Sequence, residues 1–315
     1  MAKLDVIVPI YNVEKYLNKC LDSLLNQHYK EFFVRLINDG STDSSYEIAY
    51  SYEQKHPNLF KVYSKSNGGL SDARNFGLDL SDSEYVAFID SDDYIDEKMF
   101  SEMMSLFDSN TDVVCSDLMY VYDNGEMKVS SAGKDEDLNQ ALGALKLNNS
   151  ACNKIYKRSL FNEIRFPKGK WYEDLATIPC ILYRAKSIKL IHKPFYYYYQ
   201  REGSIAHLKN EKMFDIYWSI EHIEKSLNLS NDEWHQIKSS LLIEHGLFLT
   251  SLRIKKMENL KDRAEYYQLN IKHLSNTLEN WYSESLKLTY SIKTKLVFTL
   301  FYLRFFKLTA LIYRG

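Results

Sequence analysis

Four consecutive residues, Asp90-Ser91-Asp92-Asp93, follow an almost wholly apolar stretch at 85–89 and could hold a divalent cation. Side chains at alternate positions of an extended chain point the same way, so Asp90 and Asp92 can converge on one ion while Asp93 points elsewhere. Carboxylates suit Mg²⁺ or Mn²⁺, which keep coordination positions for substrate phosphates. Such an ion would neutralise a diphosphate leaving group. A solvated turn or a helix cap is the alternative explanation for the same residues.

Two further polar segments, 38–43 and 67–75, could together bind a nucleotide. Asp39 could accept a hydrogen bond from a uracil N–H or a ribose hydroxyl, as an acidic residue does in dinucleotide-binding folds. The glycine turn Asn67-Gly68-Gly69 opens a helix, where bare backbone N–H groups and the helix dipole favour anions. Arg74 could reach a phosphate from that helix. A turn followed by a helix cap explains 38–44 without any ligand.

The elements that would position these residues alternate between strand and helix patterns. The predicted strands cover 4–9, 32–37, 60–64 and 85–89, and the helices between them cover 14–27, 44–55 and 71–80. Such alternation indicates parallel pairing in an α/β sheet with both faces covered. Ligands bind beyond the carboxyl ends of the strands in these sheets, so we expect the loops after the first, second and fourth strands to form one site.

The rest of the chain divides into a mixed middle and a helical end. Strand patterns occur at 113–116, 118–122, 187–192 and 195–199, with a hairpin-type turn at 123–125. A helix is expected over 173–183, where Pro179 would kink or shorten it. Long helical patterns follow at 213–227, 232–253, 260–286 and 292–313. The sequence therefore predicts a catalytic domain at 1–208, with its acceptor side from about 113, and a helical C-terminal domain at 209–315.

Composition excludes several classes of protein. The net charge of −2 supplies no basic field for nucleic acid. The four cysteines, Cys20, Cys115, Cys152 and Cys180, lack the short spacings of zinc ligands and the pattern of a disulfide framework, which fits a reducing cytosol. Met1 leads straight into a strand pattern without a basic and then apolar signal segment, so we expect a cytoplasmic protein.

Taken in order, four segments resemble the family 2 glycosyltransferases, which have a GT-A fold with a Rossmann-like, mostly parallel central sheet. They are Val6–Asn12 with Tyr16-Leu17, Asn38–Asp43, Asn67–Gly69 with Ala73–Gly77, and Asp90–Asp93. The resemblance covers about residues 4–207. It implies a metal-dependent, inverting transfer of a sugar from a nucleotide-linked donor, usually a UDP-sugar, with Mn²⁺ or Mg²⁺ as the cofactor.

The same resemblance assigns roles on the donor side. Pro9 and Tyr11 would frame the base, and Asp39 would bind the uridine. Asp90 would hold the ribose or the metal, and Asp92 would ligate the metal. Four more residues are expected to contact the donor: Asn67, Gly69, Arg74 and Ser91.

On the acceptor side the resemblance singles out Glu173-Asp174. Asp174 would be the general base, with Glu173 beside it. The base would take the proton from an acceptor hydroxyl as that oxygen attacks the anomeric carbon from the face opposite the diphosphate. The alternative is that two acidic residues simply favour a helix N-terminus.

Two segments resemble the capsule, exopolysaccharide or protein-glycan branch of the family: Asn153–Tyr156 and Tyr199–Ile205. The second would be a mobile loop that closes over the donor, with Arg201 and Ser204 on the diphosphate. His207 is a candidate metal ligand, although lone histidines are commonly structural. No Trp follows Arg201 as in processive synthases, so transfer of one sugar per encounter is expected.

The segment 293–307 is apolar, aromatic and basic, and its uninterrupted part is too short to span a bilayer. It could lie in a membrane interface, giving peripheral contact with the inner face of the membrane, or mediate a dimer. Packing on the other helices is the third alternative and the one we expect, because their apolar stripes need covering.

Two rival functions remain open at this stage. A sugar nucleotidyltransferase would need a Gly-x-Gly loop with a basic residue after the first strand, which Pro9–Asn12 does not provide. A non-catalytic nucleotide- or sugar-binding protein would not need Asp174. The partners expected of the enzyme are a nucleotide sugar and an acceptor, which is a lipid-linked glycan, a polysaccharide or a protein-bound glycan.

Overall fold

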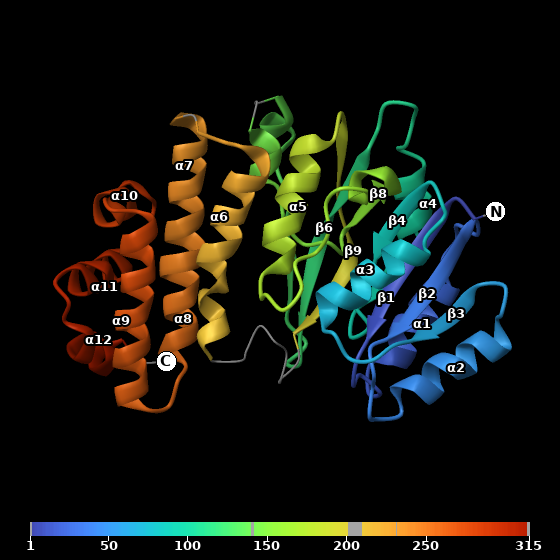
Figure 1. Ribbon diagram of the computed structural model, residues 1–315, viewed down its shortest axis with the longest axis horizontal. Helices are drawn as coiled ribbons and strands as arrows, with labels where there is room; N and C mark the ends of the chain where they lie inside the picture. Colours follow the sequence, from blue (N-terminus) through green and yellow to red (C-terminus); the bar gives the residue numbers. More distant parts are fainter. Residues whose placement is uncertain (1, 140–141, 201–209, 231, 314–315) are drawn as a thin grey trace. The chain divides into compact units, whose positions relative to one another are not determined.

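A computed structural model describes residues 2–139, 142–200, 210–230 and 232–313 of the chain (Figure 1). The described residues pack into two compact units. One comprises 2–169 with 173–200 and contains the sheet. The other comprises the short segment 170–172 with the residues from 210 onward and is helical. The predicted positions Arg201, Ser204 and His207 lie outside the described residues.

The first half of the sheet unit is a parallel α/β layer. Its strands are β1 (Leu4–Ile10), β2 (Phe32–Asn38), β3 (Phe60–Ser64) and β4 (Tyr85–Phe88), and its helices are α1 (Leu17–Leu25), α2 (Ser45–Lys55) and α3 (Leu70–Leu80). The strands lie in the order β3-β2-β1-β4, and all three pairings between them are parallel. Every residue of β1 is buried, as expected for a strand covered on both faces.

The second half completes the sheet with mixed pairing. The remaining strands are β5 (Tyr94–Ile95), β6 (Val113–Tyr122), β7 (Met127–Ser130), β8 (Lys154–Lys157) and β9 (Ile188–Gln200). β8 is antiparallel to both β4 and β6, whereas β6 and β9 are parallel. The α/β class is confirmed, but the whole sheet is mixed and not mostly parallel, because β8 enters against the direction of β4.

One irregularity explains why the sequence suggests four short strands where the structure has two long ones. β6 and β9 each run through their predicted breaks, and their register shifts where Asp117 lies opposite Pro194. Proline has no N–H to donate to a ladder, so it is tolerated at such a bulge. The carboxylate of Asp117 is buried and accepts a hydrogen bond from the N–H of Ala132 at 2.7 Å.

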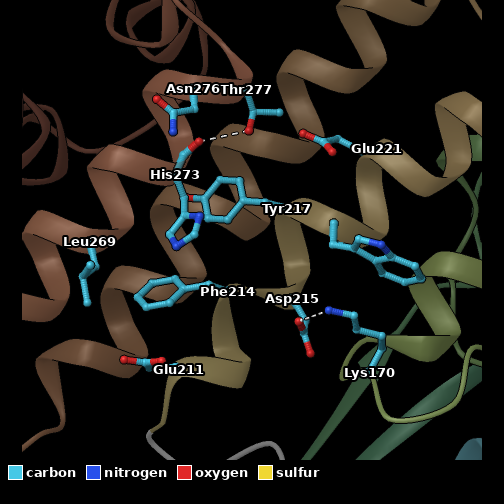
Figure 2. A pocket seen from close by; sticks show the side chains of 11 residues that line it. Lys170, Glu211, Phe214, Asp215, Tyr217, Glu221, Leu269, His273, Asn276 and Thr277 are labelled. Carbon is cyan, nitrogen blue, oxygen red and sulfur yellow. Dashed lines mark hydrogen bonds and ion pairs between the residues drawn. The ribbon is translucent and has the colours of Figure 1, made fainter.

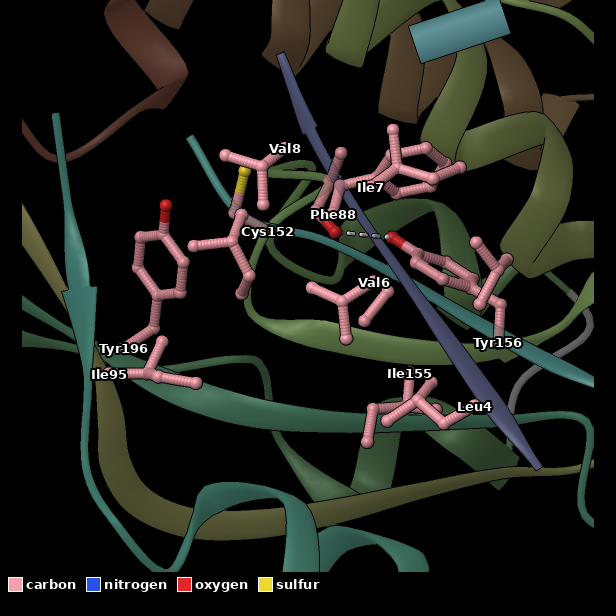
Figure 3. Packing of buried hydrophobic residues seen from close by; sticks show 14 of the residues in the cluster. Leu4, Val6, Ile7, Val8, Phe88, Ile95, Cys152, Ile155, Tyr156 and Tyr196 are labelled. Atoms are coloured by element: carbon pink, nitrogen blue, oxygen red, sulfur yellow. Dashed lines mark hydrogen bonds between the residues drawn. The ribbon is translucent and has the colours of Figure 1, made fainter. Parts of the chain in front are cut away.

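The short elements of the sheet unit are the helix α4 (Met99–Met104), the 3₁₀ turns Asp135–Asn139, Gly143–Lys146 and Arg158–Phe161, and the helix α5 (Glu173–Arg184). α5 contains Pro179 without ending there, so the expected early stop is wrong while the helix itself is confirmed. The core packs side chains from β1, β4, β8 and β9 together (Figure 3). Gly77 of α3 has to be small, because a Cβ there would lie 2.5 Å from the side chain of Ile7.

The helical unit contains a 3₁₀ turn (Glu211–Phe214) and α6 (Asp215–Leu227), α7 (Asp232–Leu241), a π-helical segment (Leu242–Leu249), α8 (Thr250–Lys255), α9 (Leu260–Thr277), α10 (Trp281–Lys287), α11 (Ile292–Tyr302) and α12 (Phe306–Ile312). The pattern at 232–253 is thus one helical run with a π-helical centre. The pattern at 292–313 breaks at Arg304, whose φ is 60°. None of the described helices is long and apolar enough to cross a membrane.

Candidate active site

The loops after β1 and β2 are tied to each other at the carboxyl edge of the sheet. Asn12, with a left-handed φ of 51°, accepts a hydrogen bond from the N–H of Thr42 at 2.9 Å and donates its own N–H to Ser41 at 3.3 Å. Beside it, Pro9 is buried at the end of β1 and the side chain of Tyr11 is half exposed. The two loops that sequence analysis assigns to the nucleotide base are therefore neighbours.

Asp39 connects this edge to the glycine turn. Its buried carboxylate accepts hydrogen bonds from the N–H groups of Gly68 at 3.0 Å and Gly69 at 2.7 Å, and the Lys65 ammonium lies 2.5 Å away. The side-chain amide of Asn67 donates to the backbone carbonyl of Asp39 at 2.9 Å. The N–H groups of Gly68 and Gly69 are therefore not bare as expected, because Asp39 already accepts from them. Asp39 holds the turn in place from β2.

The side chains of Asp90–Asp93 are of two kinds, buried and partly exposed. Asp93 is buried and accepts hydrogen bonds from the hydroxyl of Tyr196 at 2.6 Å and the N–H of Tyr199 at 2.7 Å. Burial and the neighbouring charges of Asp92 and Asp90 raise the pKa of Asp93 well above its ordinary value. Asp90 and Asp92 are partly exposed, while Ser91 is buried. Asp93 is thus fixed to β9, away from solvent. The extended chain expected at 90–93 is wrong, because these residues form a turn in which the N–H of Asp93 donates to the carbonyl of Asp90 at 3.0 Å.

Arg74 is the centre of an ion cluster built from three distant parts of the chain. Its side chain, 1% exposed, lies 2.8 Å from Asp90, 3.2 Å from Glu173 and 2.5 Å from Asp174. α3 supplies the guanidinium, the loop after β4 supplies Asp90, and the N-terminus of α5 supplies the other two carboxylates. The phosphate that sequence analysis expected as the partner of Arg74 is replaced here by these three acids. A planar guanidinium with several N–H donors suits this bridging position.

Three carboxylates share the Arg74 cation in this cluster, and the pKa values of two of them, Glu173 and Asp174, are raised. Burial and the charge of Asp174 raise the pKa of Glu173 to about 7, which Arg74 only partly offsets. Burial also raises the pKa of Asp174, against the opposing effect of Arg74. Displaced carboxyl pKa values at a cluster of this kind are typical of acid–base sites.

Residues just before β8 and at its first position complete the cluster, and sequence reasoning missed most of them. The N–H of Ala151 donates to the second carboxylate oxygen of Asp174 at 3.0 Å, and the Cys152 thiol lies 3.8 Å from Arg74. Lys154 is fully buried, and its ammonium donates to the Ser150 carbonyl at 2.7 Å. The resemblance at Asn153–Tyr156 was the available signal, but it gave no role to Ala151 or Lys154.

The side chains of the described residues do not by themselves form a complete metal site. Within this part of the chain, no group of three His, Cys, Asp or Glu side chains could hold an ion. Asp90 and Asp92 are carboxylates of the type that Mn²⁺ and Mg²⁺ bind. Phosphate oxygens of a donor commonly occupy the remaining positions of such ions. The residues present therefore fit a cation that is bound together with its substrate.

A separate, open cavity of about 510 Å³ lies in the helical unit (Figure 2). The ring of His273 stacks on Phe214 there, at 4.9 Å between centroids, and Lys170 is paired with Asp215 at 2.9 Å. The lining has more acidic than basic residues, which disfavours a diphosphate. It consists of Lys170, Glu211, Phe214, Asp215, Tyr217, Trp218, Glu221, Leu269, His273, Asn276 and Thr277.

Comparisons with known proteins identify the family of the chain. The profile of glycosyl transferase family 2 matches residues 5–165, about half of the chain. The glycosyltransferase GlyG of Streptococcus pneumoniae is 31% identical over 285 residues, which is 84% of this chain and 90% of that protein. The chain therefore belongs to glycosyl transferase family 2 and is a glycosyltransferase.

Other relatives are longer than this chain. It spans 40% of the S. pneumoniae glycosyltransferase GlyA, which is 29% identical over 291 residues. It spans 48% of the poly(ribitol-phosphate) beta-N-acetylglucosaminyltransferase TarS of Staphylococcus aureus, with 30% identity over 281 residues. A crystal structure of TarS residues 1–349 with UDP-GlcNAc matches 98% of this chain and 89% of that one, with a TM-score of 0.72 and 25% identity. The fold is GT-A with a C-terminal helical region.

Proposed function

We propose that this enzyme moves one sugar, with inversion of the anomeric carbon, from a UDP-sugar to a hydroxyl group of a glycan. One observation carries the proposal. Arg74 joins Asp90, which follows β4 at the donor edge, to Asp174, which begins α5. The residues expected at the leaving group and at the attacking hydroxyl thus belong to one ion cluster around the buried Arg74.

The donor is proposed to be a uridine nucleotide. TarS, whose crystal structure contains UDP-GlcNAc, supports this choice through its similarity over nearly the whole chain. Pro9 and Tyr11 would frame the uracil beside the loop of Asp39. Because the carboxylate of Asp39 is 2% exposed and bound to the glycine turn, its contribution to the nucleotide would be to shape that turn.

A divalent cation, Mn²⁺ or Mg²⁺, is proposed to be held by Asp90 and Asp92 together with the diphosphate. When bound, it would neutralise the charge that develops on the leaving UDP. His207 stays a predicted further ligand, and Arg201 and Ser204 stay predicted contacts of the diphosphate.

Asp174 is proposed to be the general base, with Glu173 beside it. An inverting transfer needs one base to remove the proton of the acceptor hydroxyl while the oxygen attacks. Arg74 and the N–H of Ala151 each bind one oxygen of Asp174, which fixes the carboxylate in one orientation. A base fixed in this way favours attack along one line.

The acceptor is proposed to be a glycan of the cell envelope, lipid-linked, polymeric or protein-bound, reached from the cytoplasm. The name of TarS records poly(ribitol-phosphate) as its acceptor, which supports an envelope polymer without choosing among these forms.

The experiment that tests the proposal is UDP release across a panel of UDP-sugars, with Mn²⁺ or with a chelator, water serving as a poor acceptor. Metal-dependent release from one donor is expected. Asp174→Asn should bind UDP normally and lose about 10²–10⁴-fold in transfer. Glu163→Gln, at an exposed surface ion pair, is the matched control and should transfer normally. Pyrophosphate release from UTP and a sugar phosphate would instead show a nucleotidyltransferase.

A further inference from the structure

The last two helices expose an unusual amount of apolar side chain. Ile292 is 89% exposed and Leu296 57% exposed on α11, and Leu308 and Ile312 are about half exposed on α12. We call the following set the C-terminal surface: Ile292, Lys293, Lys295, Leu296, Leu303, Arg304, Phe305, Lys307, Leu308, Leu311 and Ile312. Both helices pack against α9 and against each other at one edge of the helical unit (Figure 1).

This exposure is not explained by packing inside the described helical unit. Val297, Phe298 and Phe301 of α11 are buried, so the inward face of the helix is already apolar. Ile292, Leu296 and Leu303 recur at helical spacing on the opposite face. A helix that is apolar all round is normally covered on all sides. The expectation that this segment simply packs on the other helices accounts for only one of its two faces.

The charged residues of this surface have a single sign. No Asp or Glu follows Glu284, whereas six Lys or Arg residues do, which leaves 34 basic against 42 acidic residues in the rest of the chain. At about 100° per residue, Lys293 and Lys295 fall on either side of the exposed apolar stripe of α11. If the stripe is buried by a partner, the long apolar stems of Lys293 and Lys295 allow their ammonium groups to extend away from it.

We propose that the C-terminal surface binds the surface of a lipid bilayer that contains anionic headgroups. The apolar residues would enter the boundary between headgroups and acyl chains, and the basic residues would contact the lipid phosphates and other anionic groups. With 11 residues in α11 and 7 in α12, these helices lie on a bilayer and do not span it. A second copy fits less well, because a two-fold interface through this surface would oppose basic residues with basic residues.

The test is flotation of the full chain with vesicles of phosphatidylcholine alone and of phosphatidylcholine mixed with phosphatidylglycerol. Binding is expected with the mixed vesicles, weaker at high salt, and little with phosphatidylcholine alone. Leu296→Ser/Leu303→Ser should abolish flotation. Lys293→Gln/Lys307→Gln should weaken it by about fivefold per residue removed. Val129→Ser and Lys128→Gln, exposed on β7, are the matched controls and should float like the unmodified chain.

Absence of flotation with mixed vesicles would overturn the proposal. So would equal binding by the Leu296→Ser/Leu303→Ser variant and the unmodified chain. A dimer in sedimentation experiments without lipid that the same double substitution dissociates would assign the surface to a second copy instead. Because flotation is measured without any sugar donor, the result does not depend on the proposed transfer reaction, and the failure of one leaves the other standing.

Discussion

The guanidinium of Arg74 lies 2.5 Å from the carboxylate of Asp174, although 100 residues separate the two in the chain. The same guanidinium lies 2.8 Å from Asp90. A single buried cation thereby fixes the distance between the end of β4 and the start of α5. The geometry of the candidate active site depends on this residue more than on any of the acids alone.

Replacing Arg74 should therefore damage both stability and transfer. Arg74→Ala leaves Asp90, Glu173 and Asp174 without their shared cation, and we expect a loss of about 3–5 kcal/mol in the free energy of unfolding. Arg74→Lys keeps the charge but not the planar fork, so it should fold while transfer falls by about 10²-fold through misplacement of the base. Chemical denaturation and UDP release measure the two effects.

The control for these variants is Arg165→Lys. Arg165 pairs with Asp79 at 3.0 Å on the surface, where both side chains are well exposed, so the change should cost at most about 1 kcal/mol. Normal transfer by Arg74→Lys would show that the bridging geometry is not needed for catalysis.

The rate of transfer should fall on the acid side of its pH profile, and this acid limb should come from protonation of the Glu173–Asp174 pair. Because burial and the charge of Asp174 raise the pKa of Glu173 to about 7, the pair takes up a proton as pH falls below neutrality, and transfer should fall with it. Glu173→Gln removes a negative neighbour of Asp174, so the acid limb should shift to lower pH. If the acid limb is unchanged in this variant, Glu173 is not the group whose protonation controls transfer.

The free energy of unfolding should also depend on the ionisation of Glu173. It should fall as pH rises, whereas transfer should increase. A carboxyl whose pKa is raised on folding binds its proton more tightly in the folded state than in the unfolded state. The contribution of Glu173 to the free energy of unfolding should thus decrease as pH rises from about 4.5 to about 7. Glu173→Gln should flatten this part of the stability curve, which denaturation at several pH values would show.

Asp92 and Asp93 should respond differently to substitution although they are adjacent. Asp92→Ala should fold normally and lose metal-dependent UDP release, because its proposed role is in the donor site. Asp93→Asn should lower the melting temperature, since it disturbs the buried hydrogen bonds with Tyr196 and Tyr199. Melting curves and manganese titrations on both variants compare the two. Metal-dependent release that survives Asp92→Ala would remove this residue from the metal site.

Asp39→Asn should weaken UDP binding through the glycine turn. The change removes the charge that accepts from Gly68 and Gly69, and charge-assisted hydrogen bonds of this kind contribute about 1.5–3 kcal/mol each. We expect at least about tenfold weaker UDP binding by calorimetry. Asp72→Asn is the control, because Asp72 contacts Lys65 at 2.6 Å but does not accept from the turn. Equal affinity in the Asp39→Asn variant would show that the turn does not contact the nucleotide.

Local patterns were sufficient for the parallel half of the sheet unit. β3 has the predicted bounds at 60–64, and α3 begins one residue earlier than predicted. β1 and β4 are short runs buried at every residue, and the helices between the strands show the 3.6-residue period of one buried face. The placement of the polar loops at one edge of the sheet followed from the same alternation, because β4, β1 and β2 are parallel neighbours.

The second half of the sheet unit was harder to predict, for physical reasons. β8 begins with Lys154, a charged residue that is fully buried and bound by the Ser150 carbonyl, so its hydropathy gives no strand signal. β5 has two residues, too few for any periodicity. The role of Arg74 depends on partners far along the chain, and a motif that opens a helix contains no information about them. Sequence reasoning predicted a phosphate near Arg74 and did not predict its three carboxylate partners.

The buried position of Arg74 has a consequence for the order in which the protein can assemble during synthesis. When the ribosome has released the first four strands, only Asp90 of the three acids is available to the guanidinium. Glu173 and Asp174 emerge about 80 residues later, so a nascent chain must either leave α3 loosely packed or bury a poorly neutralised charge until then. The parallel half of the sheet unit therefore reaches its final form only when α5 arrives.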